Sequence, residues 1–377
     1  MKTDLILTDK TLQLYRYPAA SQHKSEQAWD AADEYLLACL SESEPSQTQP
    51  LWIFNDDCGA LGCALSQFHP NWINDSFVSR LACQQNLQCN DIDPSRIVFF
   101  DSLSLPDTPP HLVLIKIPKT LALLEYQLWQ LQSSVTPDTR IIAAGKVTQI
   151  HTSTLALFEK YLGPVTTSLA RKKARLIYCQ PQTHQSQPCP YPSSWKMPQR
   201  EWLIQNHSNV FSRQQLDIGA RFMLEHLPQE PVDTAIDLGC GNGVLGMALL
   251  ESGIAQHVCF ADESYMAVAS ARLNVSHNLS AAISQCEFRV SDCLSQILPR
   301  KTHLILCNPP FHQQQRITDH IAWQMFKQAK DALHRGGELR IIGNRHLGYH
   351  HKLKRLFGGY HQVAANNKFS ILSAIKR

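Results

Sequence analysis

Short, mostly apolar runs alternate with longer segments of helical periodicity along the C-terminal half of this 377-residue chain. Such runs, bounded by polar residues, are typical of buried strands. Strands that alternate with helices predict βαβ units and a parallel sheet covered by helices on both faces. The predicted strands are Ala235–Leu238, Val258–Ala261, Leu304–Cys307 and Glu338–Ile342, and the predicted helices include Val244–Glu251, Met266–Asn274 and Ile321–Leu333.

The N-terminal half repeats this pattern. Matching positions are separated by an offset that grows from 184 residues between Gly59 and Gly243 to 200 residues between Arg140 and Arg340. A smooth drift of this kind is typical of a duplicated unit. We therefore predict two tandem α/β domains with one Rossmann-like plan. Further matching pairs are Leu51–Phe54 with Ala235–Leu238, Asp75 with Glu263, Asn86 with Asn274, and Leu112–Ile115 with Leu304–Cys307.

The two halves differ where a ligand or a reaction would need particular residues. The first copy keeps the apolar pattern that makes a fold, but it has other residues at each position that carries candidate chemistry in the second copy. This difference predicts a degenerate N-terminal domain and a working C-terminal one. Asn55 stands in place of Gly239, Asp57 of Gly241, Asn74 of Asp262, and Lys116–Lys119 of Asn308–Phe311.

A proline-rich stretch separates the halves. Residues 179–198 contain five prolines and many Gln and Ser residues. Proline removes backbone donors and restricts its neighbours, so we expect an irregular linker here. The predicted domains are therefore residues 1–178 and 199–377.

Composition restricts the class of protein but does not indicate a function. The apolar fraction of 44% and charged fraction of 18% are ordinary for a globular protein. We expect a cytosolic protein with free thiols, because no signal peptide, long apolar run or CxxC pair is present. No metal site or membrane span is predicted, and a monomer is favoured. The net charge is only +3, so an RNA partner would need a local basic patch.

A glycine-rich loop carries the first candidate chemistry. Asp237-Leu-Gly-Cys-Gly-Asn-Gly243 follows a predicted strand and opens a helix, where glycines let the backbone approach a ligand. Gly241, Gly243 and Gly246 also fit the weak GxGxxG pattern of dinucleotide sites. The loop resembles class I methyltransferases more closely, because Asp237 stands two positions before Gly239. In that family the loop holds the methionine part of S-adenosylmethionine.

Two acidic residues come after the glycine loop: Asp262 follows the next predicted strand, and Asp292 follows a third strand-like segment, where a solvated loop aspartate is the alternative. Asp262 lies 19 residues after Gly243, where a carboxylate can accept hydrogen bonds from ribose hydroxyls. A helix cap is the alternative role, and neighbouring Glu263 is the weaker candidate. Class I methyltransferases often place a polar residue at the position of Asp292, against the adenine amino group.

Asn308-Pro-Pro-Phe311 decides between the two cofactors. The motif follows a buried run and resembles the (D/N/S)PP(Y/F) motif of methyltransferases that act on planar amines. The Asn308 side-chain oxygen and the Pro309 carbonyl can accept both N–H bonds of such an amine. Pro310 helps to fix the backbone, and Phe311 can stack on a base. His312 is a weaker candidate, because methyl transfer to an amine needs no prior deprotonation.

Other polar segments have more than one candidate role. Ser212 is predicted to cap the helix that follows it. Phe211, Arg213 and Asp217 are candidates for cofactor or base contacts, with packing as the alternative. Two basic clusters, residues 171–175 and 352–355, can hold phosphates or form ordinary solvated surface.

Together these motifs resemble the bacterial ribosomal RNA guanine-N2 methyltransferases. The segments VFSR, LDIGA, DLGCGNG, NPPFH and NRHLGYHHKLKRLFG carry the resemblance, and AWDAADEYLL, IKIPKTLALLE, HTSTL and NNKFSIL favour the large-subunit branch over nearly the full length. The resemblance implies S-adenosylmethionine as cofactor and one guanine N2 in 23S rRNA as substrate. Cofactor contacts carry over to Asp237, Gly239, Gly241, Gly243 and Asp262, and target contacts to Asn308, Pro309, Pro310 and Phe311.

Two other interpretations remain open. The same motif serves guanine-N2 methylation of 16S rRNA, adenine-N6 methylation and protein-glutamine methylation. A non-catalytic RNA-binding or assembly factor is the third class, against which the intact glycines, Asp262 and Asn308 argue.

Overall fold

The computed structural model describes residues 2–22, 26–42, 45–46, 48–182, 186–297, 301–310 and 315–377. The chain divides into two compact units, Met1–Pro190 (unit 1) and Tyr191–Arg377 (unit 2). The division falls inside the predicted linker. That linker is not irregular throughout, because Ser193–Lys196 forms strand β10, which pairs with β11 (Leu203–Asn206).

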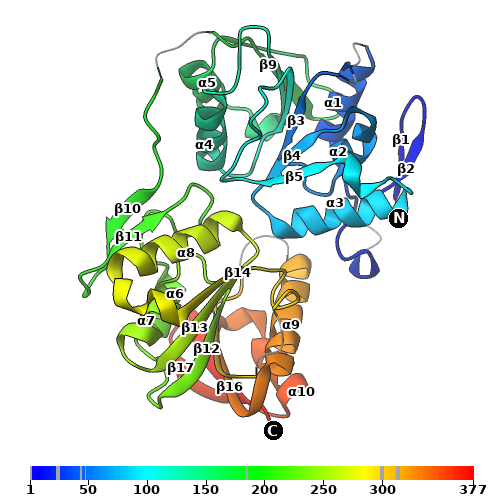
Figure 1. Cartoon of the computed structure of the whole chain (residues 1–377). Coiled ribbons are helices and arrows are strands. Elements are labelled where there is room, and N and C mark those ends of the chain that lie inside the picture. The colour runs from blue at the N-terminus through cyan, green and yellow to red at the C-terminus, as the bar shows by residue number, and fades with distance from the viewer. Residues whose placement is uncertain are drawn as a thin grey trace. The chain divides into compact units, whose positions relative to one another are not determined.

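Unit 2 is built on a seven-stranded sheet with the order β14-β13-β12-β15-β16-β18-β17 (Figure 1). The five strands from β14 to β16 pair in parallel, and β18 and β17 complete the sheet as antiparallel strands. The strands are β12 (Val232–Leu238), β13 (Ala255–Asp262), β14 (Cys286–Val290), β15 (Thr302–Cys307), β16 (Leu333–Asn344), β17 (His361–Ala365) and β18 (Phe369–Ile375).

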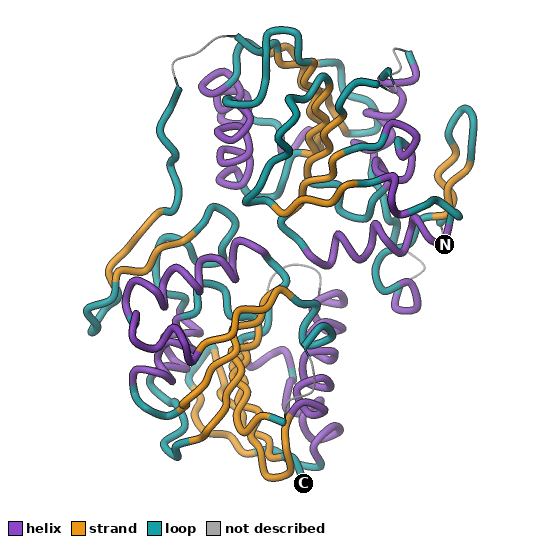
Figure 2. Tube along the Cα trace, in the orientation of Figure 1, coloured by secondary structure: helices purple, strands orange, loops and turns teal. Residues whose placement is uncertain are grey.

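Helices cover both faces of this sheet (Figure 2). Successive side chains of a strand point to opposite faces. Leu304 and Leu306 of β15 accordingly pack in one buried cluster, and Ile305 and Cys307 in another. The first face is covered by α6 (Ile218–Leu224), α7 (Val244–Glu251) and α8 (Tyr265–Asn278), and the second by α9 (Gln315–Ala332) and α10 (Tyr349–Phe357).

Unit 1 has the same plan. Its sheet order is β5-β4-β3-β6-β7-β9-β8, which becomes identical to that of unit 2 when each set is renumbered. This identity of topology confirms the predicted tandem Rossmann-like domains. The strands are β3 (Leu51–Phe54), β4 (Asn71–Asn74), β5 (Val98–Asp101), β6 (Leu112–Lys116), β7 (Arg140–Lys146), β8 (Val165–Thr167) and β9 (Ala174–Cys179), and the helices are α1 (Ala31–Ser41), α2 (Ala60–Ala64), α3 (Phe77–Cys89), α4 (Leu121–Leu131) and α5 (Thr152–Tyr161).

The repeat extends to a hairpin in front of each sheet. Unit 1 begins with β1 (Asp4–Ile6) and β2 (Thr11–Gln13), which correspond to β10 and β11 of unit 2. The amide of Asn86 on α3 both accepts from and donates to the backbone of Tyr15, and Asn274 on α8 does the same with Gln205. The asparagine pair noticed in the sequence therefore holds the end of each hairpin, or the residues just after it, against the equivalent helix.

Most predicted elements are present with longer bounds, but the parallel-sheet prediction was wrong for the last two strands. A short turn joins β17 to β18, and such a turn permits only antiparallel pairing. The Ser212 cap was also wrong, because Ser212 lies in a turn with φ of 52° and Asp217 caps α6. Within the described ranges, no helix combines the length and apolarity of a membrane span.

Candidate active site

The carboxyl ends of four neighbouring parallel strands bring the predicted site residues to one edge of the unit 2 sheet. Asp237 lies among the last residues of β12 and the glycine loop follows that strand, Asp262 ends β13, Asp292 follows β14, and Asn308 follows β15. The strand order reverses at β12, which lies between β13 and β15. Ligands of open α/β sheets bind at this kind of switch point.

The glycine loop leaves open space at its tip. Gly239, Gly241 and Gly243 all have positive φ, which glycine adopts without strain. A Cβ on Gly241 would have no heavy atom within 4 Å, whereas a Cβ on Gly243 would lie 2.9 Å from the Ala271 Cβ. The loop is therefore packed tightly where it enters α7 and open where a ligand would approach.

The buried Asp237 side chain stabilises the glycine loop from the interior of the protein. Its Oδ2 accepts a hydrogen bond of 2.8 Å from the Gly246 backbone N–H in the first turn of α7. Burial raises the pKa of the Asp237 carboxyl to about 7, although the Gly246 hydrogen bond opposes this rise. Asp237 thus fixes the strand-to-helix turn rather than facing solvent.

This raised pKa predicts a pH-dependent stability difference for Asp237→Asn. The folded protein holds the Asp237 proton up to about pH 7, whereas the unfolded chain releases it near the ordinary aspartate pKa of 3.8. The contribution of Asp237 is therefore present at low pH and is lost as the pH rises towards 7. Asparagine can still accept from Gly246 and does not titrate. We expect the melting temperature of Asp237→Asn, relative to wild type, to increase between about pH 5 and pH 8; a constant difference would contradict the assignment.

Asp262 ties the glycine loop to β13. Its Oδ2 accepts from the Gly241 backbone N–H at 3.0 Å, and its Oδ1 accepts from Ser264 at 3.1 Å. Burial raises the pKa of Asp262, while the Gly241 and Ser264 bonds oppose the rise. Ser264, not Asp262, is the cap of α8. The carboxylate therefore lies at the tip of the loop, where it can also accept from ribose hydroxyls.

Sequence reasoning did not select Asn206 at the end of β11. Asn206 is fully buried, its Oδ1 accepts from Asn242 of the glycine loop, and its Nδ2 has no partner in the described part of the chain. A buried donor without an acceptor is costly unless a ligand supplies one. No local motif could have found this residue, because its partner lies 36 positions away.

Asp292 follows β14 and is nearly buried. Its Oδ2 accepts from the Gln324 side chain of α9 at 2.9 Å. A carboxylate oxygen has lone pairs for a second donor, so this position can still receive an amino group.

Asn308 lies where β15 ends, on the side of the sheet that α6 covers. Its Nδ2 donates to Asp217 Oδ2 at 3.2 Å, and its Oδ1 is buried without a partner in the described residues. Pro309 is buried and Pro310 is exposed. Phe311 and His312 lie outside the described residues, so their predicted roles stay predictions.

The segment before α6 is partly engaged in packing. Arg213 donates to the Ser208 carbonyl at 2.6 Å, and its guanidinium lies 5.4 Å from the centre of the Tyr191 ring. Phe211 is 52% exposed. Among these candidates, Asp217 contacts another predicted site residue, Asn308.

Comparisons with known proteins agree with this geometry. The family models for the RLMG N-terminal domain and the Methyltransferase small domain match residues 2–183 and 201–373. Ribosomal RNA large subunit methyltransferase G of Aeromonas salmonicida is 55% identical, with all of both chains covered. The protein of that name from Klebsiella pneumoniae is 53% identical, covering 98% of this chain and 97% of its own. The chain belongs to the ribosomal RNA large subunit methyltransferase G family.

The fold is shared with a solved methyltransferase. A T. thermophilus 16S rRNA N2 methyltransferase, solved with AdoMet and guanosine, aligns over 100% of this chain and 98% of its own, with a TM-score of 0.75 and 18% identity. At that identity the likeness concerns the fold, which is the class I methyltransferase fold in both units. The predicted family, fold and enzyme class are confirmed.

The residues of unit 2 fit S-adenosylmethionine, the cofactor of this large subunit methyltransferase G family. The space above Gly241, the Asp262 carboxylate and the unpartnered Asn206 Nδ2 surround one loop. The open glycine turn leaves room for a ligand, and an acidic side chain at a strand end can accept hydrogen bonds from ribose hydroxyls.

In unit 1 the equivalent space is filled by the protein itself. Asn55, which replaces Gly239, has φ of 60°, and its side chain exchanges two hydrogen bonds with Gln127 of α4. Lys116, which replaces Asn308, is buried and paired with Asp33 at 2.6 Å and Asp30 at 3.1 Å. Burial alone would lower the pKa of Lys116, but these carboxylates outweigh it and hold that pKa above its usual range.

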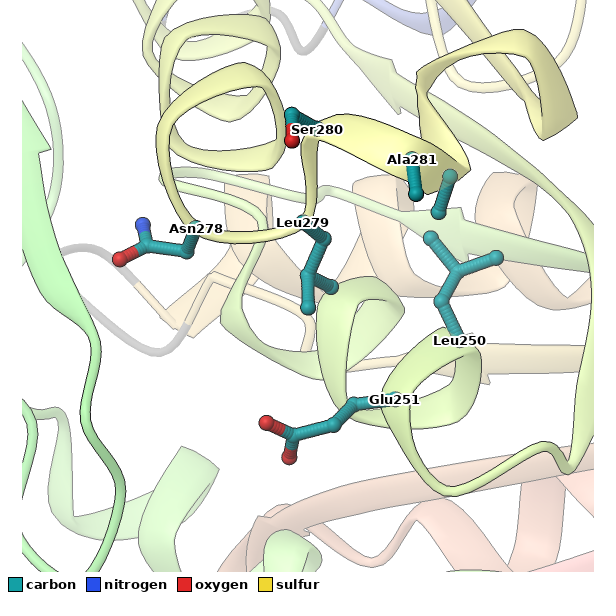
Figure 3. A pocket seen from close by; sticks show the side chains of 7 residues that line it. Leu250, Glu251, Asn278, Leu279, Ser280 and Ala281 are labelled. Carbon is teal, nitrogen blue, oxygen red and sulfur yellow. The ribbon is translucent and has the colours of Figure 1, made fainter.

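A pocket elsewhere in unit 2 has no part in this site. A cavity of about 320 Å³ lies between the C-terminal ends of α7 and α8, where Leu250 and Ala281 face each other (Figure 3). These helices run back towards the amino ends of the strands, so the pocket lies at the edge opposite Asn308. Its lining of aliphatic side chains, Glu251 and Asn278 suggests no chemistry.

Proposed function

We propose that this protein transfers a methyl group from S-adenosylmethionine to the exocyclic N2 of one guanine in 23S rRNA. The Asn308 Oδ1 carries the proposal, because it is a buried acceptor without a partner among the described residues, beside the cofactor loop. A buried acceptor is stable only if something donates to it. The guanine amino group brings two N–H donors.

Each residue of the site has its own role in this reaction. Asn308 Oδ1 and the Pro309 carbonyl accept the two N–H bonds and turn the nitrogen lone pair towards the methyl group. Gly239, Gly241, Gly243, Asp262 and Asp292 hold the cofactor, and Asp237 shapes their loop. When bound, S-adenosylmethionine supplies an electrophilic methyl on sulfur. The N–C bond forms as the C–S bond breaks, and solvent takes the surplus N2 proton. No metal is needed.

The curated relatives favour the large-subunit substrate over the alternatives. The names of these relatives specify large subunit rRNA, at 52–55% identity over nearly complete chains. Methylation of 16S rRNA, of adenine N6 or of a protein glutamine would use the same acceptor geometry, so the product must be identified directly. We place the reaction in the cytoplasm with the rRNA.

The deciding experiment uses tritiated S-adenosylmethionine, the purified chain, and rRNA from a strain that lacks the gene. The expected product after digestion is N2-methylguanosine from 23S rRNA. Label in N6-methyladenosine, in 16S rRNA or in protein would replace the proposed substrate. Absence of label from both naked RNA and assembled subunits would contradict the proposal.

Unit 1 contributes RNA binding in this proposal. Five cations lie exposed at the carboxyl edge of its sheet. Lys146 ends β7 and pairs with the first residue of β9. The Lys173 carbonyl accepts a hydrogen bond from the Val147 backbone N–H at 2.9 Å, so Lys146 and Lys173 lie close together. Clustered exposed cations neutralise phosphates regardless of sequence. The five are Lys119, Lys146, Arg171, Lys172 and Lys173, of which Lys172 is also paired with Glu34.

Charge reversal at Lys146 tests this role in the full chain. Lys146→Glu is expected to raise the KM for rRNA several-fold and to flatten the salt dependence by about one unit of slope, as loss of one phosphate contact does. Saturated turnover should be unchanged. Arg96→Glu is the matched control, because Arg96 is an exposed cation of unit 1 at the amino end of β5. Equal behaviour of the two variants would exclude an RNA contact at Lys146.

A further inference from the structure

We infer that Asp217 is a positioning residue that fixes the orientation of the Asn308 amide. This inference rests on the proposed function, because it concerns the oxygen that receives the target amine. In this role Asp217 acts by holding the Asn308 side chain, and it does not need to contact the cofactor or the base.

One carboxylate oxygen makes both relevant contacts. Asp217 Oδ2 accepts from the Ala220 backbone N–H at 2.8 Å, which caps α6, and from Asn308 Nδ2 at 3.2 Å. An ionised carboxylate only accepts, so it can bind the nitrogen end of the amide but repels the oxygen end. The Asn308 amide is thereby held with Nδ2 towards Asp217 and with Oδ1 away from it.

The orientation matters because the two ends of an asparagine amide are opposite in character. Oδ1 is buried and has no partner in the described part of the chain. After a 180° turn of the amide, Nδ2 would occupy that position and would present N–H groups to the N–H groups of the target amine. The acceptor on which the methyl-transfer geometry depends would then be missing.

The first turn of α6 lies close to this pair of side chains. A Cβ on Gly219, in the first turn of α6, would lie 2.9 Å from Asp217 Oδ2 and 3.6 Å from Asn308 Oδ1. Contacts between 2.9 and 3.4 Å force the neighbouring atom to move. A side chain at position 219 would therefore crowd the Asp217 carboxylate.

The duplicated unit contains the same pairing with different partners. Asp30 caps α1 by accepting from Ala32 at 2.9 Å, and it also accepts from Lys116 Nζ at 3.1 Å. Lys116 ends β6 as Asn308 follows β15. In both units, therefore, the N-cap carboxylate of one helix (α6 or α1) accepts a hydrogen bond from a nitrogen at the end of the equivalent strand (β15 or β6).

Serine at position 217 separates capping from positioning. Serine is as good a helix cap as aspartate, but its Oγ is too short to hold Asn308 as well. We expect Asp217→Ser to keep its melting temperature and its affinity for S-adenosylmethionine, while kcat falls at least about tenfold, as a misplaced reactive geometry does. Asp217→Thr serves if the serine variant does not fold. Asp217→Asn, whose single oxygen can make both bonds, should recover most of the kcat.

A double-mutant cycle distinguishes a positioning role of Asp217 from a purely structural one. In the Asn308→Ala background, Asp217→Ser should cause no further loss of kcat, because the amide on which Asp217 acts is gone. Asp30→Ser, the same change at the equivalent cap of unit 1, should leave kcat unchanged. The inference is overturned if Asp217→Ser has wild-type kcat, if its loss persists without the Asn308 amide, or if Asp217→Asn is no better than serine. The wild-type product, identified in the same assay, tests the proposed function separately.

Discussion

Replacement of Asn308 by alanine is expected to lower kcat/KM by about 10²–10³-fold, the cost of removing one preorganised hydrogen-bonding group from a reaction centre. The reason is structural. Asn308 Oδ1 is a buried acceptor directly after β15, and it has no partner among the described residues. Single-turnover methylation of 23S rRNA is the measurement, because it isolates the chemical step.

Two comparisons make this result specific. The affinity for S-adenosylmethionine should be unchanged, since the Asn308 side chain binds Asp217 rather than the glycine loop. Asn308→Ser keeps a hydroxyl that can accept one N–H bond, so its loss should be smaller. If Asn308→Ala retains wild-type single-turnover kinetics, the amine-binding role of β15 is wrong.

Replacement of Asp262 by alanine should weaken S-adenosylmethionine binding by about 10²-fold or more. Hydrogen bonds to a charged group contribute about 1.5–3 kcal/mol each, and the variant loses those to the ribose as well as the bond that holds Gly241. About 1.4 kcal/mol corresponds to tenfold in affinity. Titration calorimetry measures both the dissociation constant and the stoichiometry.

The duplicated unit provides the control for this measurement. Asn74 occupies the position of Asp262 in unit 1, where its Oδ1 accepts from Ser76 just as Asp262 accepts from Ser264. Asn74→Ala should not change cofactor affinity, because Asn55 and Gln127 fill the equivalent space. Wild type should bind one cofactor per chain. A stoichiometry of two would show that unit 1 retains a working site.

The sequence predicted those parts of the fold that depend on local pattern. The bounds of β3 and α7 agree with the apolar runs, because buried strands and a helix after a glycine turn are local features. The offset between the halves predicted the duplication, which the equal strand orders confirm. The glycine loop, Asp262 and Asn308 were likewise visible, since each follows a recognisable strand.

Contacts between distant segments could not be predicted in this way. Asp217 and Asn308 are 91 positions apart, and Lys116 and Asp30 are 86 apart, so no periodicity connects them. The cap of α6 was misplaced for a related reason. Ser212 satisfies the local preference for serine before a helix, but its position in a turn leaves Asp217 as the first residue able to reach Ala220.

The Lys116 ion pair has a consequence for the stability of unit 1. Lys116→Asn would leave Asp33, which is buried, without its cation, and breaking a buried pair typically costs about 3–5 kcal/mol. Asn55 would still exchange its two hydrogen bonds with Gln127. The residue that stands in place of Asn308 is thus part of what keeps unit 1 folded. Selection for a folded domain alone therefore favours lysine over asparagine at this position.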